Sequence, residues 1–93
     1  MQTPRACRAE IQTDGVVRAV DVVNRELSAL AGGALVSFYV PPGCVVVLRG
    51  EQVKLRMVQP GDRVRVTYAE ERDSLVARAV EAQPGHPPFG ISR

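Results

Sequence analysis

Basic side chains alternate with apolar residues in two neighbouring segments of the chain. The cations of these segments are Lys54, Arg56, Arg63 and Arg65. Successive side chains of a strand point to opposite faces, so a hairpin turning at residues 60–62 would bring all four cations onto one exposed face. Residues 49–68 contain five basic and two acidic residues, and like charges opposed across a sheet destabilise it. This spacing indicates a face that needs neutralising by acidic side chains or by an anionic partner.

Single-stranded nucleic acid is one such partner. Proteins bind it with a cationic groove that follows the backbone and with aromatic rings on which the bases stack, and Tyr68 would supply a ring. The interpretation that needs no partner is a solvated face whose arginines pair with Glu70, Glu71 or Glu81. We favour the solvated face and keep weak nucleic-acid binding through the basic residues as the alternative.

Cysteine and histidine side chains support nucleophilic and metal chemistry in other proteins, but their positions here do not indicate either. The chain has Cys7, Cys44 and His86, which lack the paired spacing of zinc ligands. A thiol nucleophile needs a neighbouring base, and His86 lies in a Pro- and Gly-rich segment. We therefore predict that the chain is not an enzyme and has no cofactor, metal site or small-molecule substrate. Cys44 is expected to be a buried thiol; two free thiols and one Cys7–Cys44 bridge both stay open.

Length and composition indicate one β-rich domain. The 93 residues are 45% hydrophobic with a net charge of +2, enough for a modest core, and the many valines favour strands. No apolar stretch follows the N-terminal arginines, and the longest apolar run, residues 44–48, is far shorter than the about 20 residues that cross a bilayer. We expect a cytoplasmic protein with no membrane partner, although a processed chain or an excised module would look the same.

The elements that must position the cations begin with a turn at residues 59–66. Pro60 presets its backbone angle, Gly61 permits a positive φ, and Asp62 can accept hydrogen bonds from nearby amides. Val64 and Val66 then alternate with arginines, which is typical of a strand with one buried face. This segment predicts a small β-barrel or sandwich.

Residues 16–30 allow two interpretations. Five apolar residues spaced along this segment would share one helical face, and Asp14 could cap the helix. The many valines instead favour two strands joined by a turn at Asn24, because branched side chains suit a pleated surface. We favour the two strands.

Further strands and turns follow at short intervals. We expect strands at residues 35–40, 44–48, 53–57, 63–69 and 75–81, with a two-residue turn at Gly32 and Gly33. The predicted fold is all-β, a small five- or six-stranded OB-like barrel with flexible termini. Its parts are a loose arm (residues 1–12), the barrel domain (13–82) and a disordered Pro/Gly-rich tail (83–93).

Residues 15–82 resemble a group of uncharacterised bacterial OB-like small β-barrel domains. The resemblance depends on turns and core positions: Gly15-Val16-Val17, Val20-Asp21, Leu27, the turn at Gly50-Glu51 and the Pro60-Gly61-Asp62 turn before a Val-x-Val strand. The chain is also distantly similar to the periplasmic copper-chaperone barrels. Their metal site uses a histidine, methionines and a tryptophan, whereas this chain has no tryptophan and only Met57 besides the first residue. The resemblance therefore implies the fold but not copper binding.

These observations predict a non-enzymatic module with a structural or protein-interaction role. Exposed strand edges and the apolar segment at residues 44–48 would favour self-association by strand pairing. The expected partners are another protein or a second copy of the chain, with nucleic acid as the alternative.

Overall fold

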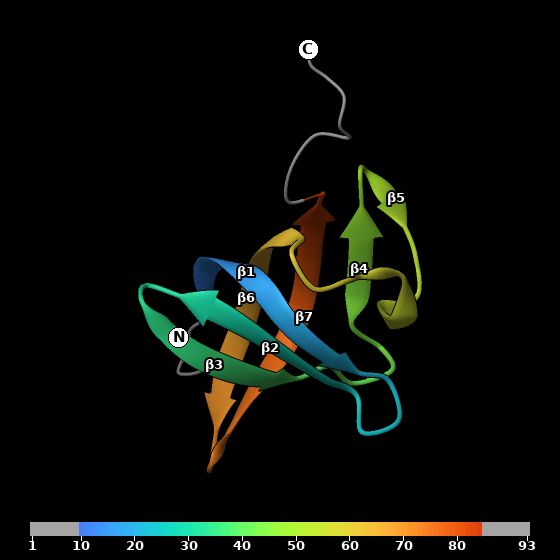
Figure 1. Ribbon diagram of the computed structural model, residues 1–93. Helices are drawn as coiled ribbons and strands as arrows, with labels where there is room; N and C mark the ends of the chain where they lie inside the picture. Colours follow the sequence, from blue (N-terminus) through green and yellow to red (C-terminus); the bar gives the residue numbers. More distant parts are fainter. Residues whose placement is uncertain (1–9, 85–93) are drawn as a thin grey trace, which may run out of the picture.

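The computed structural model describes residues 10–84, which form seven strands and one short 3₁₀ helix (Figure 1). The elements are β1 (Ile11–Asp21), β2 (Glu26–Ala31), β3 (Ala34–Tyr39), β4 (Val45–Leu48), β5 (Glu51–Gln52), η1 (Leu55–Met57), β6 (Arg63–Glu71) and β7 (Ser74–Gln83). Strand β1 begins two residues before the predicted barrel domain (13–82) and β7 ends one residue after it, and the division into arm, barrel and tail stays a prediction. The rest of the predicted arm and tail, residues 1–9 and 85–93, lies outside the described residues.

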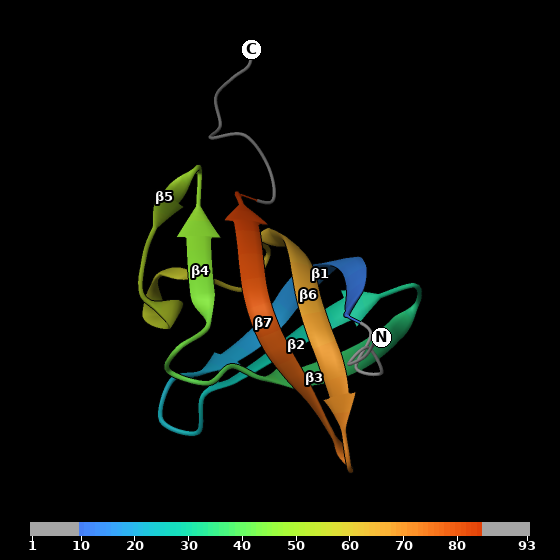
Figure 2. The same cartoon turned by 180° about the vertical axis from the view of Figure 1, so that it is seen from behind.

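Five strands close into a barrel. The antiparallel strands run in the order β3-β2-β1-β6-β7, and a parallel pairing of Tyr39 with Val76 joins β3 to β7 and closes the ring. Strands β4 and β5 extend the wall beyond β7. Figures 1 and 2 show β1, β2 and β3 crossing one side of the molecule, with β6 and β7 running across them on the other. The prediction of an all-β small barrel is confirmed: five strands close it, and two more are added.

Strand β1 belongs to both layers of the barrel. Its first half pairs with β6 and its second half with β2, and the register shifts between Val17 and Ala19, so that Arg18 is an extra residue. Such a bulge bends a strand and increases its twist. At Gly15 a Cβ atom would lie 2.7 Å from the carbonyl oxygen of Leu30, so the close approach of β1 to β2 requires glycine there.

The turn at residues 59–62 has the predicted structure. The amide of Asp62 donates to the carbonyl of Gln59 (3.1 Å), its carboxylate accepts from the Gln59 amide (2.9 Å), and Gly61 has a φ of 96°. Proline followed by glycine at positive φ is typical of a type II turn. Two backbone hydrogen bonds of 2.8 Å then join this turn to Val17, one to its carbonyl and one from its amide. These two hydrogen bonds therefore fix β1 to the turn at the point where the strand bends.

The segment at residues 16–30 forms two strands, so the strand interpretation is confirmed and the helical one is wrong. Asp21 ends β1 and accepts hydrogen bonds from the backbone amide (3.0 Å) and side-chain amide (2.8 Å) of Asn24. The next residue, Arg25, adopts a positive φ of 56°. The Gly32–Gly33 turn is also as predicted, with φ values of 61° and 85°.

The core fills the barrel with side chains from every layer. Phe38 and Leu27 are its largest fully buried side chains, and burying one such side chain contributes about 1.5–3 kcal/mol. Val64 and Val66 are buried while their arginine neighbours are exposed, as predicted from the alternation. The other buried residues are Val17, Ala29, Val40, Val46, Leu55, Val58, Ala69, Ala77, Val80 and Ala82.

The predicted strand at residues 53–57 is wrong. Only Glu51 and Gln52 pair with β4 as strand β5, and after one further bond from the Val53 amide to the Val46 carbonyl (2.8 Å) the chain turns into η1. In a 3₁₀ helix, residues three apart lie above each other. Leu55 begins η1, and Val58 follows it directly with its amide donating to the Leu55 carbonyl (3.0 Å). Both side chains are buried, whereas Met57 is exposed. Burial of Leu55 and Val58 therefore determines the local structure, and the two-residue alternation that predicted a strand does not.

The close approach at Gly15 predicts a position-specific loss of stability. We expect Gly15→Ala to destabilise the fold by about 1–3 kcal/mol, because the added methyl group must displace the Leu30 backbone. The measurement is the free energy of unfolding in urea.

Gly43→Ala is the matched control, because a Cβ at Gly43 meets no atom within 4 Å. Its effect should stay within about 0.5 kcal/mol. Equal losses from the two substitutions would contradict this account of β1.

Candidate functional site

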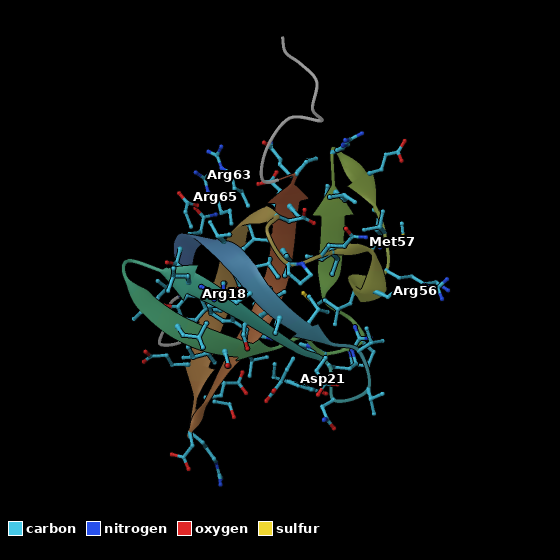
Figure 3. All side chains as sticks on the ribbon, in the orientation of Figure 1. Arg18, Asp21, Arg56, Met57, Arg63 and Arg65 are labelled. Carbon is cyan, nitrogen blue, oxygen red and sulfur yellow. The ribbon has the colours of Figure 1, made fainter. Side chains whose placement is uncertain are left out.

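The four predicted cations do not share a face. Arg63 and Arg65 lie on β6, whose neighbours are β1 and β7, whereas Lys54 and Arg56 belong to the η1 segment. Figure 3 shows Arg63 and Arg65 on one side of the molecule and Arg56 on the opposite side. The predicted hairpin is wrong, because residues 53–57 turn away from the sheet instead of pairing with β6. Nucleic-acid binding by these residues stays a prediction without structural support.

Arg65 is neutralised by an acidic residue that the sequence did not indicate. The register of β1 on β6 places Asp14 opposite Arg65, and the guanidinium donates from Nε to Oδ1 (2.8 Å) and from Nη2 to Oδ2 (3.4 Å). This hydrogen bond lowers the pKa of Asp14 and raises that of Arg65. Of the predicted acidic partners, Glu81 lies opposite Arg65 on β7, and Glu71 pairs instead with Arg78 (3.0 Å).

Tyr68 packs into the barrel wall. Its ring lies 5.0 Å from that of Phe38, centroid to centroid, at an interplanar angle of 56°. A tilted pair of this kind stabilises a core. Tyr68 is therefore half-buried beside Phe38, and it is not a freely exposed ring of the kind on which a base would stack.

Cys44 is a half-buried free thiol just before β4. Its sulfur lies 3.6 Å from the carbonyl oxygen of Val45, and burial raises its pKa. A raised pKa leaves less of the reactive thiolate at neutral pH. The other residues considered for a disulfide or a nucleophile–base pair, Cys7 and His86, lie outside the described residues.

Lys54 and Arg56 line a pocket of about 410 Å³ together with Arg25. Sequence analysis missed Arg25, because nothing nearby in the sequence marks it as part of a basic group. Its Nε donates to the carbonyl of Val40 (2.7 Å) and its Nη2 to that of Pro41 (3.4 Å). The Val40 amide in turn donates to the Arg25 carbonyl (2.7 Å). These bonds fix the guanidinium where β2 begins and β3 ends.

A patch of uncharged side chains lies on the outer side of β1, β2 and β3. Val16 lies opposite Leu30, and Leu30 lies opposite Leu35, so the three side chains form one row across the strands. Their exposed fractions are 39%, 39% and 63%. In the neighbouring row the hydroxyls of Ser28 and Ser37 are 3.0 Å apart. We call Val16, Leu30 and Leu35 the apolar row.

Strand β3 is an edge strand over most of its length. It pairs with β2 from Ala34 to Tyr39, but with β7 only through Tyr39 and Val76. Residues 34–38 therefore have one side without a partner strand in the described chain. None of these five residues is charged and none is proline.

Two kinds of site are not found within residues 10–84. No group of three or more His, Cys, Asp or Glu side chains is placed to hold a metal ion. Over the same part of the chain, no helix is long and apolar enough to cross a membrane.

Solved structures share this fold. Silver-bound CusF from Escherichia coli has a TM-score of 0.67 at 12% identity, covering 81% of this chain and 92% of that one. Apo-CusF from the same organism has a TM-score of 0.65 at 14% identity, covering 86% and 94%. PilY2, a fimbrial biogenesis protein from Pseudomonas aeruginosa, has a TM-score of 0.57 at 19% identity, covering 80% and 87%.

These identities show the fold alone: the chain is a small closed β-barrel of the kind seen in the copper chaperone CusF. The predicted similarity to copper-chaperone barrels is confirmed at that level. No protein-family model matches the sequence, and comparison with curated protein sequences finds no match.

The Asp14–Arg65 pair predicts a titration shift that depends on the arginine. We expect Asp14 to titrate below the ordinary range of aspartate, and Arg65→Gln to move its pKa back up. The measurement is a titration of the side-chain carboxyl carbons by NMR. Because the folded-state pKa is lowered, the pair stabilises the fold above the ordinary aspartate pKa, and this contribution is lost as the pH falls through the folded-state value.

Asp21 is the internal control of the same titration. Its pKa is also lowered, but by hydrogen bonds from Asn24, so Arg65→Gln should leave it unchanged. An Asp14 pKa that does not respond to the substitution would contradict the pairing.

Proposed function

We propose that this chain is a non-catalytic protein-interaction module that pairs with a second copy of itself along strand β3. The observation that carries the proposal is the edge at residues 34–38, which is uncharged and lacks a partner strand in the described chain. The backbone amides and carbonyls of such an edge can bind another strand.

The protections that usually block edge pairing are absent from residues 34–38. Soluble proteins protect an edge with charged residues, proline, a bulge or a very short strand. The edge strand at the other end of the sheet, β5, has two residues and begins with a glutamate. By contrast, β3 has six residues, and its pairing with β2 shows no register shift.

The segment predicted to favour self-association is not an edge. Residues 45–48 form β4, which pairs with β7 on one side and, at Val47 and Leu48, with β5 on the other. We therefore assign self-association by strand pairing to β3, the longer of the two end strands of the sheet.

A second copy fits this edge because β3 is compatible with itself. Antiparallel pairing of two β3 strands centred on Val36 would oppose Leu35 to Ser37 and Ala34 to Phe38, with no charge facing a like charge. Both chains would use the same residues, as a two-fold symmetric contact requires. Leu35 of each copy would then lie beside Ser37 of the other, so the apolar row of one barrel would continue into the row of Ser37 and Ser28 of its partner.

The solved structures with this fold support a non-catalytic barrel, but they do not identify what this chain binds. One is a chaperone seen with silver and another takes part in fimbrial biogenesis. Silver binding is not carried over, because residues 10–84 hold no metal-binding group of acidic, cysteine and histidine residues and only one methionine, Met57.

The proposal predicts a dimer that depends on Leu35. We expect a concentration-dependent dimer by light scattering, and Leu35→Lys should raise its dissociation constant roughly tenfold or more, because the charge would lie in the paired edge. Leu35 is largely exposed in one copy, so the substitution should not unfold the barrel.

Val23→Lys is the matched control, since Val23 is 90% exposed in the turn between β1 and β2. It should leave the dissociation constant unchanged. A protein that stays monomeric at every concentration up to about 1 mM would overturn the proposal, because any dimer it formed would be weaker than most functional dimers.

A further inference from the structure

The pocket beside η1 has an unusual distribution of charge. Its wall contains Arg25, Lys54 and Arg56, and none of its lining residues is acidic. Arg25 comes from the turn before β2, and the other two come from the segment after β5. Two segments far apart in the sequence thus place three cations around one cavity, on the side of the molecule where Figure 3 labels Arg56.

These three cations have no ion-pair partner among residues 10–84. The ion pairs between described residues join Arg65 to Asp14 and Arg78 to Glu10 and Glu71, and none includes a residue of the pocket. Arg25 is also half-buried. It uses Nε and Nη2 to hold two backbone carbonyls, so its Nη1 hydrogens stay available for an acceptor.

The floor of the same pocket is apolar. Val46 and Leu55 belong to the hydrophobic core, and Val53 packs against it. A volume of about 410 Å³ lies within the range of small-molecule sites, which combine apolar walls with a few polar groups that orient the ligand.

We propose that this pocket binds a carboxylate that carries an apolar group. The carboxylate would lie between Arg25 and Lys54, with Arg56 at the rim, and the apolar group would lie on Val46, Val53 and Leu55. A guanidinium held by backbone carbonyls loses little freedom when it binds an anion, since its geometry is already fixed. Fatty acids and peptide C-termini with apolar last residues share this chemistry.

The experiment uses the full chain with Cys7→Ser, so that Cys44, which lines the pocket, is its only thiol. The probe is octanoate, followed by amide shifts in NMR and by the rate at which an alkylating reagent modifies Cys44. We expect saturable binding, shifts at Val46, Leu55 and Arg25, and slower alkylation of Cys44. Octanol should bind more weakly than octanoate, because it lacks the charge.

The matched variants distinguish binding of octanoate in the pocket from its non-specific attraction to basic residues elsewhere. Lys54→Gln combined with Arg56→Gln should weaken octanoate binding roughly 3- to 30-fold, as expected for the loss of two solvent-exposed ion pairs. Arg63→Gln, on the opposite side of the molecule, should not change it. N-acetyl-leucyl-leucine and its C-terminal amide distinguish the two sources of ligand: tighter binding of the acid than of octanoate would indicate a peptide C-terminus, and the reverse a fatty acid.

Three results would overturn the proposal. They are the absence of saturable binding at low salt, equal binding of octanol and octanoate, and equal weakening by Arg63→Gln and by the double variant. Arg25 is left unchanged, because its bonds to Val40 and Pro41 also hold the fold together.

Discussion

Strand β1 is shared by both layers of this barrel, and the closed fold depends on how its bend is held. Gly15 lets the strand approach β2, Arg18 is the extra residue of the bulge, and the turn at residues 59–62 bonds both backbone groups of Val17. A single chain segment can then pair with β6 along one half and with β2 along the other. Without this bend the two sets of strands would be separate sheets with additional open edges.

The same bend determines which surfaces the protein exposes. Because β1 lies between β2 and β6, the apolar row and the arginines of β6 occupy adjoining parts of the outer wall, and Val16 lies opposite both Leu30 and Arg63. Pairing of β1 with β6 also brings Asp14 to Arg65 and neutralises that arginine. At the far end of the layer, β3 is left with an uncharged edge, while Arg25, Lys54 and Arg56 lie around the separate pocket beside η1.

Sequence reasoning succeeded where the determinants are local. Pro60, Gly61 and Asp62 define their turn within four residues, and branched side chains distinguish the strands at residues 16–30 from a helix. It failed at residues 53–57. The spacing of Leu55 and Met57 fits a strand, but that of Leu55 and Val58 fits a 3₁₀ turn equally well. Only packing against the barrel decides between the strand and the turn. It also missed the Asp14–Arg65 pair, whose partners are 51 residues apart, since that contact depends on the register of β1 and β6. Arg25 was missed for a similar reason, because its bonds reach carbonyls 15 and 16 residues away.

Pairing of two copies through β3 is the central functional claim, and amide hydrogen exchange along residues 34–38 tests it most directly. In an edge strand, every second backbone amide points away from the paired strand, here β2. These outward-pointing amides of β3 should exchange quickly in dilute protein and slowly in concentrated protein. Protection confined to alternate residues, appearing only as the concentration rises, is the result that we expect. Exchange rates that are equal at both concentrations would contradict the claim.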